Sequence, residues 1–174
     1  MKRLTILAAI FVFSYFSSTA FGQNVKQVSN VESPYKVGAT NISIGNPVYA
    51  QKVLWAWKFY DDNTLDKIDD LIANDVVATL ANGTVIKGKE NFLKGIKDYR
   101  NSLASALSTV DACTTLKTPD DKDHEVVSIW GTETATAKDG TVTKTHLNEV
   151  WFFNKKGKVD EFHQMAAKEM PPQK

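Results

Sequence analysis

The chain has 174 residues, of which 43% are hydrophobic and 24% are charged, and its formal net charge is +1. This composition is ordinary for one globular domain. The near-neutral charge excludes a strongly basic surface of the kind that holds nucleic acids or anionic membranes.

The first 22 residues predict a secretory signal peptide. Two basic residues precede the apolar run Leu4–Phe16, and small residues follow it up to an expected cleavage point before Gln23. The run is too short to favour a membrane span, although a retained anchor is the alternative. Without residues 1–22 the chain has 19 basic and 20 acidic residues, a net charge of −1. We therefore expect an exported protein, periplasmic or secreted, that has no membrane attachment after cleavage.

A single domain is expected over residues 47–170, with a short tail over 171–174. Residues 23–46 have no sustained periodicity and are interpreted as a linker or loosely docked arm. The single cysteine, Cys113, cannot form a disulfide within its own chain, and we predict a buried thiol in a strand.

The first half of this domain predicts three helices. The pair Asn46-Pro47 supplies an N-cap and a first helical position, so a helix is expected over 47–61. Thr64 is expected to cap a second, shorter helix, whose leucines and isoleucines recur at helical spacing. A third helix is expected over 89–104, after a short hairpin with the turn pair Asn82-Gly83.

The second half predicts long antiparallel strands, expected over 107–117, 124–137 and 141–154. The pair Asp139-Gly140 is preferred in two-residue type I′ turns. A turn of that length would place Trp130 opposite Glu149 on the neighbouring strand.

The stretch 142–166 predicts a further hairpin, because two runs of β-branched and aromatic residues flank a polar turn that contains a glycine. A turn over 155–158 fixes which residues lie opposite one another. We predict two pairs on one face, Glu149 with Gln164 and Trp151 with Phe162.

This face of the strands predicts a pocket for a small molecule. Aromatic and aliphatic side chains surround one carboxylate and one amide there, a composition typical of ligand sites. Core packing is the alternative role for the tryptophans. Tyr60, near the end of the first helix, is expected to direct its hydroxyl into the same space. The candidate residues are Tyr60, Trp130, Leu147, Glu149, Trp151, Phe162 and Gln164.

Three helices followed by long strands predict an α+β fold, in which a curved antiparallel sheet wraps around the helices and leaves a conical cavity. The opposite, convex sheet face is also apolar, and helices can cover only one face. We therefore expect a homodimer through the convex face, using Val127, Ile129, Val150, Phe152 and Met165.

Short sequence patterns occur in a fixed order along the chain: Asn63–Asp66, Ala73–Asp75, Ile86–Glu90, Glu149–Phe153 and Lys156–Val159. Their order and spacing between Val48 and Ala166 resemble the nuclear transport factor 2-like superfamily, and within it the SnoaL-like group. The resemblance implies a cone-shaped α+β barrel with a deep cavity, often in a homodimer. Ketosteroid isomerase, polyketide cyclases and limonene epoxide hydrolase have related folds, alongside many non-enzymatic members.

The catalytic positions that the resemblance implies are mostly filled by unreactive side chains. The base aspartate of the isomerases corresponds to Leu80, which becomes a candidate lining residue, and their oxyanion-hole tyrosine corresponds to Ala56. Their protonated oxyanion-hole aspartate corresponds to Glu149. The last-strand aspartate of the cyclases and the epoxide hydrolase lies near Gln164, whose amide cannot act as a base. Fold likeness alone therefore implies no particular reaction.

Glu149 is the one acid–base candidate on these strands. Desolvation in an aromatic cavity would disfavour its charged form, so it could donate a hydrogen bond to a ligand or act as a base. A structural carboxyl that is satisfied by Gln164, Tyr60 or water is the alternative. We expect no cofactor and no metal site, since His124, His146 and His163 lack ligand spacing.

The leading hypothesis is an exported domain that binds a small apolar or aromatic molecule. An isomerase-, cyclase- or hydrolase-type enzyme using Glu149 is the first alternative. A non-catalytic dimeric interaction module, whose own side chains fill the cavity, is the second.

Overall fold

The computed structural model describes residues 34–35, 42–119 and 123–169. The predicted signal peptide and C-terminal tail, and most of the predicted arm, lie outside the described residues. None of the helices in these ranges is long and apolar enough to cross a membrane. The elements in chain order are β1 (Ser43–Ile44), α1 (Pro47–Asp61), η1 (Leu65–Leu71), β2 (Ile72–Thr79), β3 (Val85–Lys87), α2 (Lys89–Ser102), β4 (Leu103–Lys117), β5 (Glu125–Ala137), β6 (Val142–Phe153) and β7 (Val159–Lys168).

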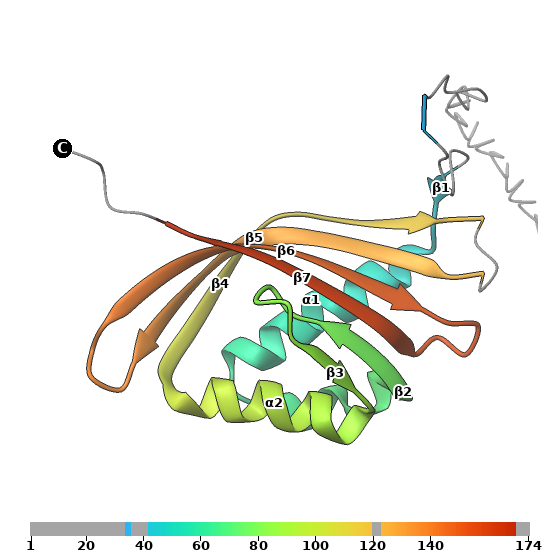
Figure 1. Cartoon of the computed structure of the whole chain (residues 1–174). Coiled ribbons are helices and arrows are strands. Elements are labelled where there is room, and N and C mark those ends of the chain that lie inside the picture. The colour runs from blue at the N-terminus through green and yellow to red at the C-terminus, as the bar shows by residue number, and fades with distance from the viewer. Residues whose placement is uncertain (1–33, 36–41, 120–122, 170–174) are drawn as a thin grey trace, which may run out of the picture.

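The strands of the described chain form one sheet in the order β1-β4-β5-β6-β7-β2-β3. Neighbouring strands are antiparallel, except that β2 and β7 run parallel. Figure 1 shows a strongly curved sheet with α1 and α2 on its concave side. The predicted α+β fold is therefore confirmed, although the sheet curls without closing into a barrel.

The first helix has the predicted bounds and the predicted cap. The Asn46 side chain accepts a hydrogen bond from the backbone N–H of Val48 at 3.0 Å, and Pro47 occupies the first turn. The second helix, η1, is a 3-10 helix, and Thr64 forms no side-chain cap bond to it, so that capping prediction is wrong. The chain then continues directly into β2 at Ile72.

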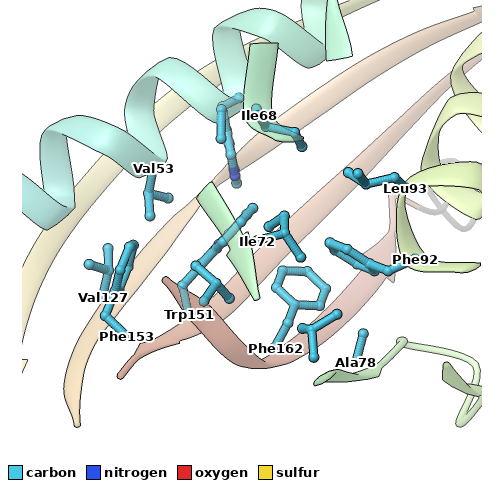
Figure 2. Packing of buried hydrophobic residues seen from close by; sticks show 14 of the residues in the cluster. Val53, Ile68, Ile72, Ala78, Phe92, Leu93, Val127, Trp151, Phe153 and Phe162 are labelled. Atoms are coloured by element: carbon cyan, nitrogen blue, oxygen red, sulfur yellow. The ribbon is translucent and has the colours of Figure 1, made fainter. Parts of the chain in front are cut away.

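The core lies between the helices and the concave sheet face, as Figure 2 shows. Val53 of α1, Phe92 of α2 and Val127 of β5 are almost completely buried. Trp151 pairs with Phe162 as predicted, and their ring centroids lie 4.9 Å apart. Burying a side chain of this size contributes roughly 1.5–3 kcal/mol, so these contacts fix the helices against the sheet.

The register between β6 and β7 is the predicted one, with Glu149 opposite Gln164. Two features combine to produce it. The hairpin closes with a three-residue loop, shorter than predicted, because the Asn154 N–H donates to the Lys158 carbonyl at 2.9 Å. A bulge opposite Phe152–Phe153 then compensates for the shorter loop, since it adds one residue, Asp160, to β7.

The register between β5 and β6 differs from the predicted one by one residue. The Ala137 N–H donates to the Thr141 carbonyl at 2.8 Å, so this loop also has three residues instead of two. Gly140 adopts the left-handed conformation that such a loop requires, with φ of 86°. No bulge between β5 and β6 compensates for the extra residue.

Adjacent residues of a strand point to opposite faces of the sheet. This one-residue shift therefore exchanges the core-facing and convex-facing residues of β5 relative to the prediction. Glu149 pairs with Ile129, and Trp130 lies on the convex face, where it is 39% exposed. Val127 and Ile129, predicted for the convex face, are instead fully buried in the core. Three of the predicted dimer residues keep their place on the convex face: Val150, Phe152 and Met165.

Candidate functional site

A cavity of about 560 Å³ lies between the helices and the concave face of the sheet. This volume is typical of sites that hold small molecules. Residues from α1, η1, α2, the turn between β2 and β3, and the strands β3 to β7 line it. The walls are mainly aromatic and aliphatic, and they include Trp57, Leu80, Phe92, Leu147, Trp151 and Phe162.

One face of α1 is directed at the sheet. Val53, Ala56, Trp57 and Tyr60 recur at the spacing of a single helix face, and the first three are buried. Trp57 and Tyr60 extend from this face into the cavity. The helix therefore supplies the cavity with two polar groups, an indole N–H and a phenol.

Glu149 is buried in the cavity wall, 7% exposed, and receives three hydrogen bonds. The indole Nε1 of Trp57 donates to Oε2 at 2.7 Å, and the indole Nε1 of Trp151 donates to the same oxygen at 3.1 Å. The amide Nε2 of Gln164 donates to Oε1 at 3.0 Å. These donors come from α1, β6 and β7, so the carboxylate is fixed from three elements.

Burial raises the pKa of the Glu149 carboxyl, because desolvation disfavours its charged form. The hydrogen bonds from Gln164, Trp57 and Trp151 stabilise the anion and oppose that effect in part. A second carboxylate, Glu133, raises the pKa further by repulsion. Glu149 is thus a carboxyl that holds its proton at a higher pH than an exposed glutamate does.

Glu133 of β5 is the second acidic group of the cavity and is 6% exposed. The Tyr60 hydroxyl donates to its Oε1 at 2.6 Å. Burial, followed by this hydrogen bond, raises the pKa of the Tyr60 phenol well above its ordinary value. Tyr60 therefore remains a protonated donor, and Glu133 remains its acceptor.

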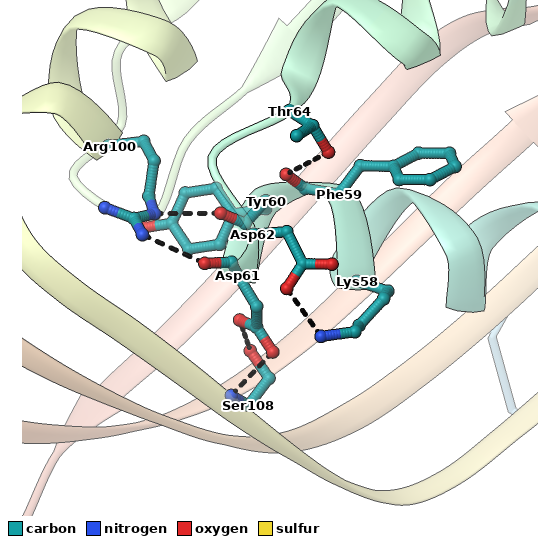
Figure 3. A network of polar contacts seen from close by, with 8 residues as sticks. All are labelled: Lys58, Phe59, Tyr60, Asp61, Asp62, Thr64, Arg100 and Ser108. Carbon is teal, nitrogen blue, oxygen red and sulfur yellow. Dashed lines mark hydrogen bonds and ion pairs between the residues drawn. The ribbon is translucent and has the colours of Figure 1, made fainter.

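The end of α1 that carries Tyr60 is anchored by a second polar network, shown in Figure 3. The buried Arg100 of α2 donates to the backbone carbonyls of Tyr60 and Asp61 at 2.8 and 2.9 Å. The Asp61 carboxylate accepts from the backbone N–H and the hydroxyl of Ser108, at 3.0 and 2.8 Å. These bonds join α1, α2 and β4 beside the cavity.

All but one of the predicted pocket residues line this cavity: Tyr60, Leu80, Leu147, Glu149, Trp151, Phe162 and Gln164. Trp130 does not, because it borders a shallow groove on the convex face together with His146 and Met165. The predicted bond between Gln164 and Glu149 is present, whereas Tyr60 bonds Glu133 instead of Glu149.

Two polar groups of the site, Glu133 and the Trp57 indole, were not predicted from the sequence. Glu133 lies on the same face of β5 as Val127 and Ile129, so a three-residue loop at Gly140 would have placed it on the same sheet face as Glu149, opposite Thr145. No pocket role was predicted for Trp57, although a buried indole N–H needs a hydrogen-bond acceptor and this need was the available signal.

This arrangement can hold a ligand or exchange a proton with it. Glu149 and Glu133 lie in one cavity, and the first has a raised pKa. Two carboxyls with different environments are a common basis of acid–base chemistry.

No protein-family model matches the sequence, and no curated protein matches it either. Solved structures do. A nuclear transport factor 2-like protein of unknown function from Burkholderia pseudomallei is 17% identical, with a TM-score of 0.56 over 68% of this chain and 90% of that chain. An LEH-like epoxide hydrolase from M. tuberculosis is 11% identical, with a TM-score of 0.55 over 69% of this chain and 84% of that chain.

A second nuclear transport factor 2-like protein of unknown function, from Exiguobacterium, is 11% identical. Its TM-score is 0.54, over 70% of this chain and 98% of that chain. Identities this low show the fold and not the activity. The chain has the nuclear transport factor 2-like fold, as the sequence resemblance implied.

Proposed function

We propose that this chain is an exported protein that binds a small apolar or aromatic molecule in the cavity, with Glu149 as the polar group that orients it. One observation supports this function above all. Three donors from three elements hold the Glu149 carboxylate in the wall of an otherwise mainly apolar space of about 560 Å³. Few polar groups at fixed positions in an apolar cavity are characteristic of ligand sites.

Filling the cavity should abolish binding without unfolding the protein. Gly95 of α2 lines the cavity, and the nearest atom to an added Cβ would be Cδ1 of Ile86 at 3.6 Å. We expect Gly95→Leu to weaken the binding of a neutral apolar dye such as Nile red at least ~10-fold, because the new side chain occupies the ligand's space. Fluorescence titration measures this affinity.

A matched control comes from the outer side of α1. Trp55→Leu alters an exposed apolar residue outside the cavity, so dye affinity should stay at the wild-type value. Equal affinities for wild type and Gly95→Leu would mean that the dye binds elsewhere, and the proposed site would be wrong.

An acid–base enzyme of the isomerase, cyclase or hydrolase kind is the second candidate function. The raised pKa of Glu149 and the presence of Glu133 in the same cavity favour it. In such an enzyme Glu149→Gln would retain ligand binding and lose turnover. The open cavity gives no support to a module whose own side chains fill this space.

We also propose that two copies associate through the convex face, with Trp130 joining the three apolar residues that remain there. Trp130→Glu should then give a monomer, because an unpaired charge in a packed interface is costly. Trp55→Glu is the control, since Trp55 is 53% exposed on the outer side of α1. Light scattering at micromolar concentration reports the mass, and a monomeric wild type would contradict the proposal.

A further inference from the structure

The polar side chains of the cavity have unused hydrogen-bond acceptors, whereas most of their donors are already bonded. Each carboxylate oxygen can accept two hydrogen bonds. Both positions on Oε2 of Glu149 are taken by indole N–H groups, and Oε1 has one position left. The carbonyl of Gln164 also remains available, because its amide nitrogen makes the bond to Glu149.

Glu133 adds a further free acceptor. Its Oε1 accepts from the Tyr60 hydroxyl, which uses the only hydrogen of that phenol. Within the described ranges, the only fully buried side-chain polar atom that lacks a partner is Oγ1 of Thr115. Oε2 of Glu133 accepts no hydrogen bond from the described residues and is not among the fully buried unpaired atoms. Part of its surface is therefore accessible, and we place it toward the cavity that this residue lines.

The charge of the cavity is also unbalanced. No lysine, arginine or histidine of the described chain forms an ion pair with Glu133 or Glu149. Arg100 is directed at two backbone carbonyls behind Tyr60, and Lys168 is exposed at the cavity margin. A buried carboxylate without a cation is unfavourable, so a cation in the cavity would be stabilised.

The walls suit an organic cation better than a metal ion. The described residues contain no group of three or more histidine, cysteine or carboxylate side chains that could hold a metal. The cavity is lined instead by the rings of Trp57, Tyr60, Trp151 and Phe162. Aromatic rings attract ammonium groups and also accommodate an apolar body.

We propose that the ligand of this cavity is an organic ammonium ion with an aromatic or apolar body, whose charged end lies between Glu133 and Glu149. This inference rests on the proposed binding function and specifies its ligand class. An ammonium hydrogen bonds a free carboxylate oxygen, the charge of the other carboxylate adds attraction, and the rest of the molecule contacts the aromatic walls.

Three probes of similar size and different charge test the inference: 2-phenylethylamine, 2-phenylethanol and 3-phenylpropionate. Calorimetric titration of the full chain at pH 7 should show the amine binding at least ~10-fold more tightly than the alcohol, and the carboxylate binding most weakly. Glu133→Gln and Glu149→Gln, which each remove one negative charge from the cavity, should each reduce the preference for the amine over the alcohol.

Asp111→Asn is the matched control, because it removes one negative charge on the convex side. It should leave the preference for the amine intact. Equal binding of amine and alcohol to the wild type would overturn the ammonium inference and leave the proposed function standing. An amine preference that persists in both glutamine variants would overturn the assignment to these carboxylates. Failure of all three probes to bind at millimolar concentration would contradict the binding function itself.

Discussion

Replacing Glu149 with leucine should lower the free energy of unfolding by about 2–4 kcal/mol, because three buried or partly buried donors lose their acceptor. The donors are the indoles of Trp57 and Trp151 and the amide of Gln164. Glu149→Gln should retain the fold. The introduced carbonyl accepts from both indoles, and the introduced amide donates to Gln164 once that side chain rotates. Urea denaturation of the two variants gives the comparison.

The same pair of proteins reports the protonation of Glu149. Its pKa is raised in the folded state above the ordinary value of 4.5, so the folded protein binds the proton more tightly than the unfolded chain. The resulting stabilisation is complete below pH 4.5 and decreases as pH rises through the folded pKa. Relative to Glu149→Gln, the wild type should therefore lose stability upward from about pH 4.5. Parallel profiles for the two proteins would contradict the raised pKa.

Replacing Gly131 with alanine should destabilise the protein by about 3 kcal/mol, the upper range for a side chain forced into a packed site. A Cβ at this position would clash with the Thr109 carbonyl oxygen and lie 3.0 Å from Cα of Val110. Both are backbone atoms of β4, which bulges there between Val110 and Ala112. The clash can be relieved only by moving one strand away from the other.

Gly95→Ala is the control for this substitution. Gly95 lies inside α2, and its added Cβ would make an ordinary contact with Ile86. Alanine there should raise the free energy of unfolding by roughly 0.5–1 kcal/mol, since glycine is unfavourable within a helix. Denaturant titration of both variants should show opposite signs, and a neutral Gly131→Ala would mean that β4 and β5 are less closely apposed.

Local sequence predicted most helices and strands of the fold. It did not predict which residues of β5 face the core. Asn46-Pro47 and the helical spacing of apolar residues gave α1 its bounds. The type of loop at Gly140 depends on whether the loop contains two or three residues, and Asp-Gly pairs occur in both kinds. One residue of loop length decided whether Trp130 or Glu133 faced the cavity.

The correct position of Glu149 and Gln164 depended on two compensating features. A four-residue turn predicts the same pairing as the observed three-residue loop followed by a bulge opposite Phe152–Phe153. Bulges depend on packing and twist as well as on local sequence, so the bulge was not predicted. The fold was therefore more predictable than the pairing register of the strands. The register decides which side chains face the cavity, so the site was less predictable than the fold.

The parallel pairing of β2 with β7 has a consequence for folding. In the described chain the β2–β3 hairpin joins the rest of the sheet only through β7, for example where Ala78 lies opposite Phe162. Contacts between residues so far apart in sequence form slowly, and a chain under synthesis cannot make them until its C-terminal part has emerged. The sheet and the cavity are thus incomplete until β7 has been made.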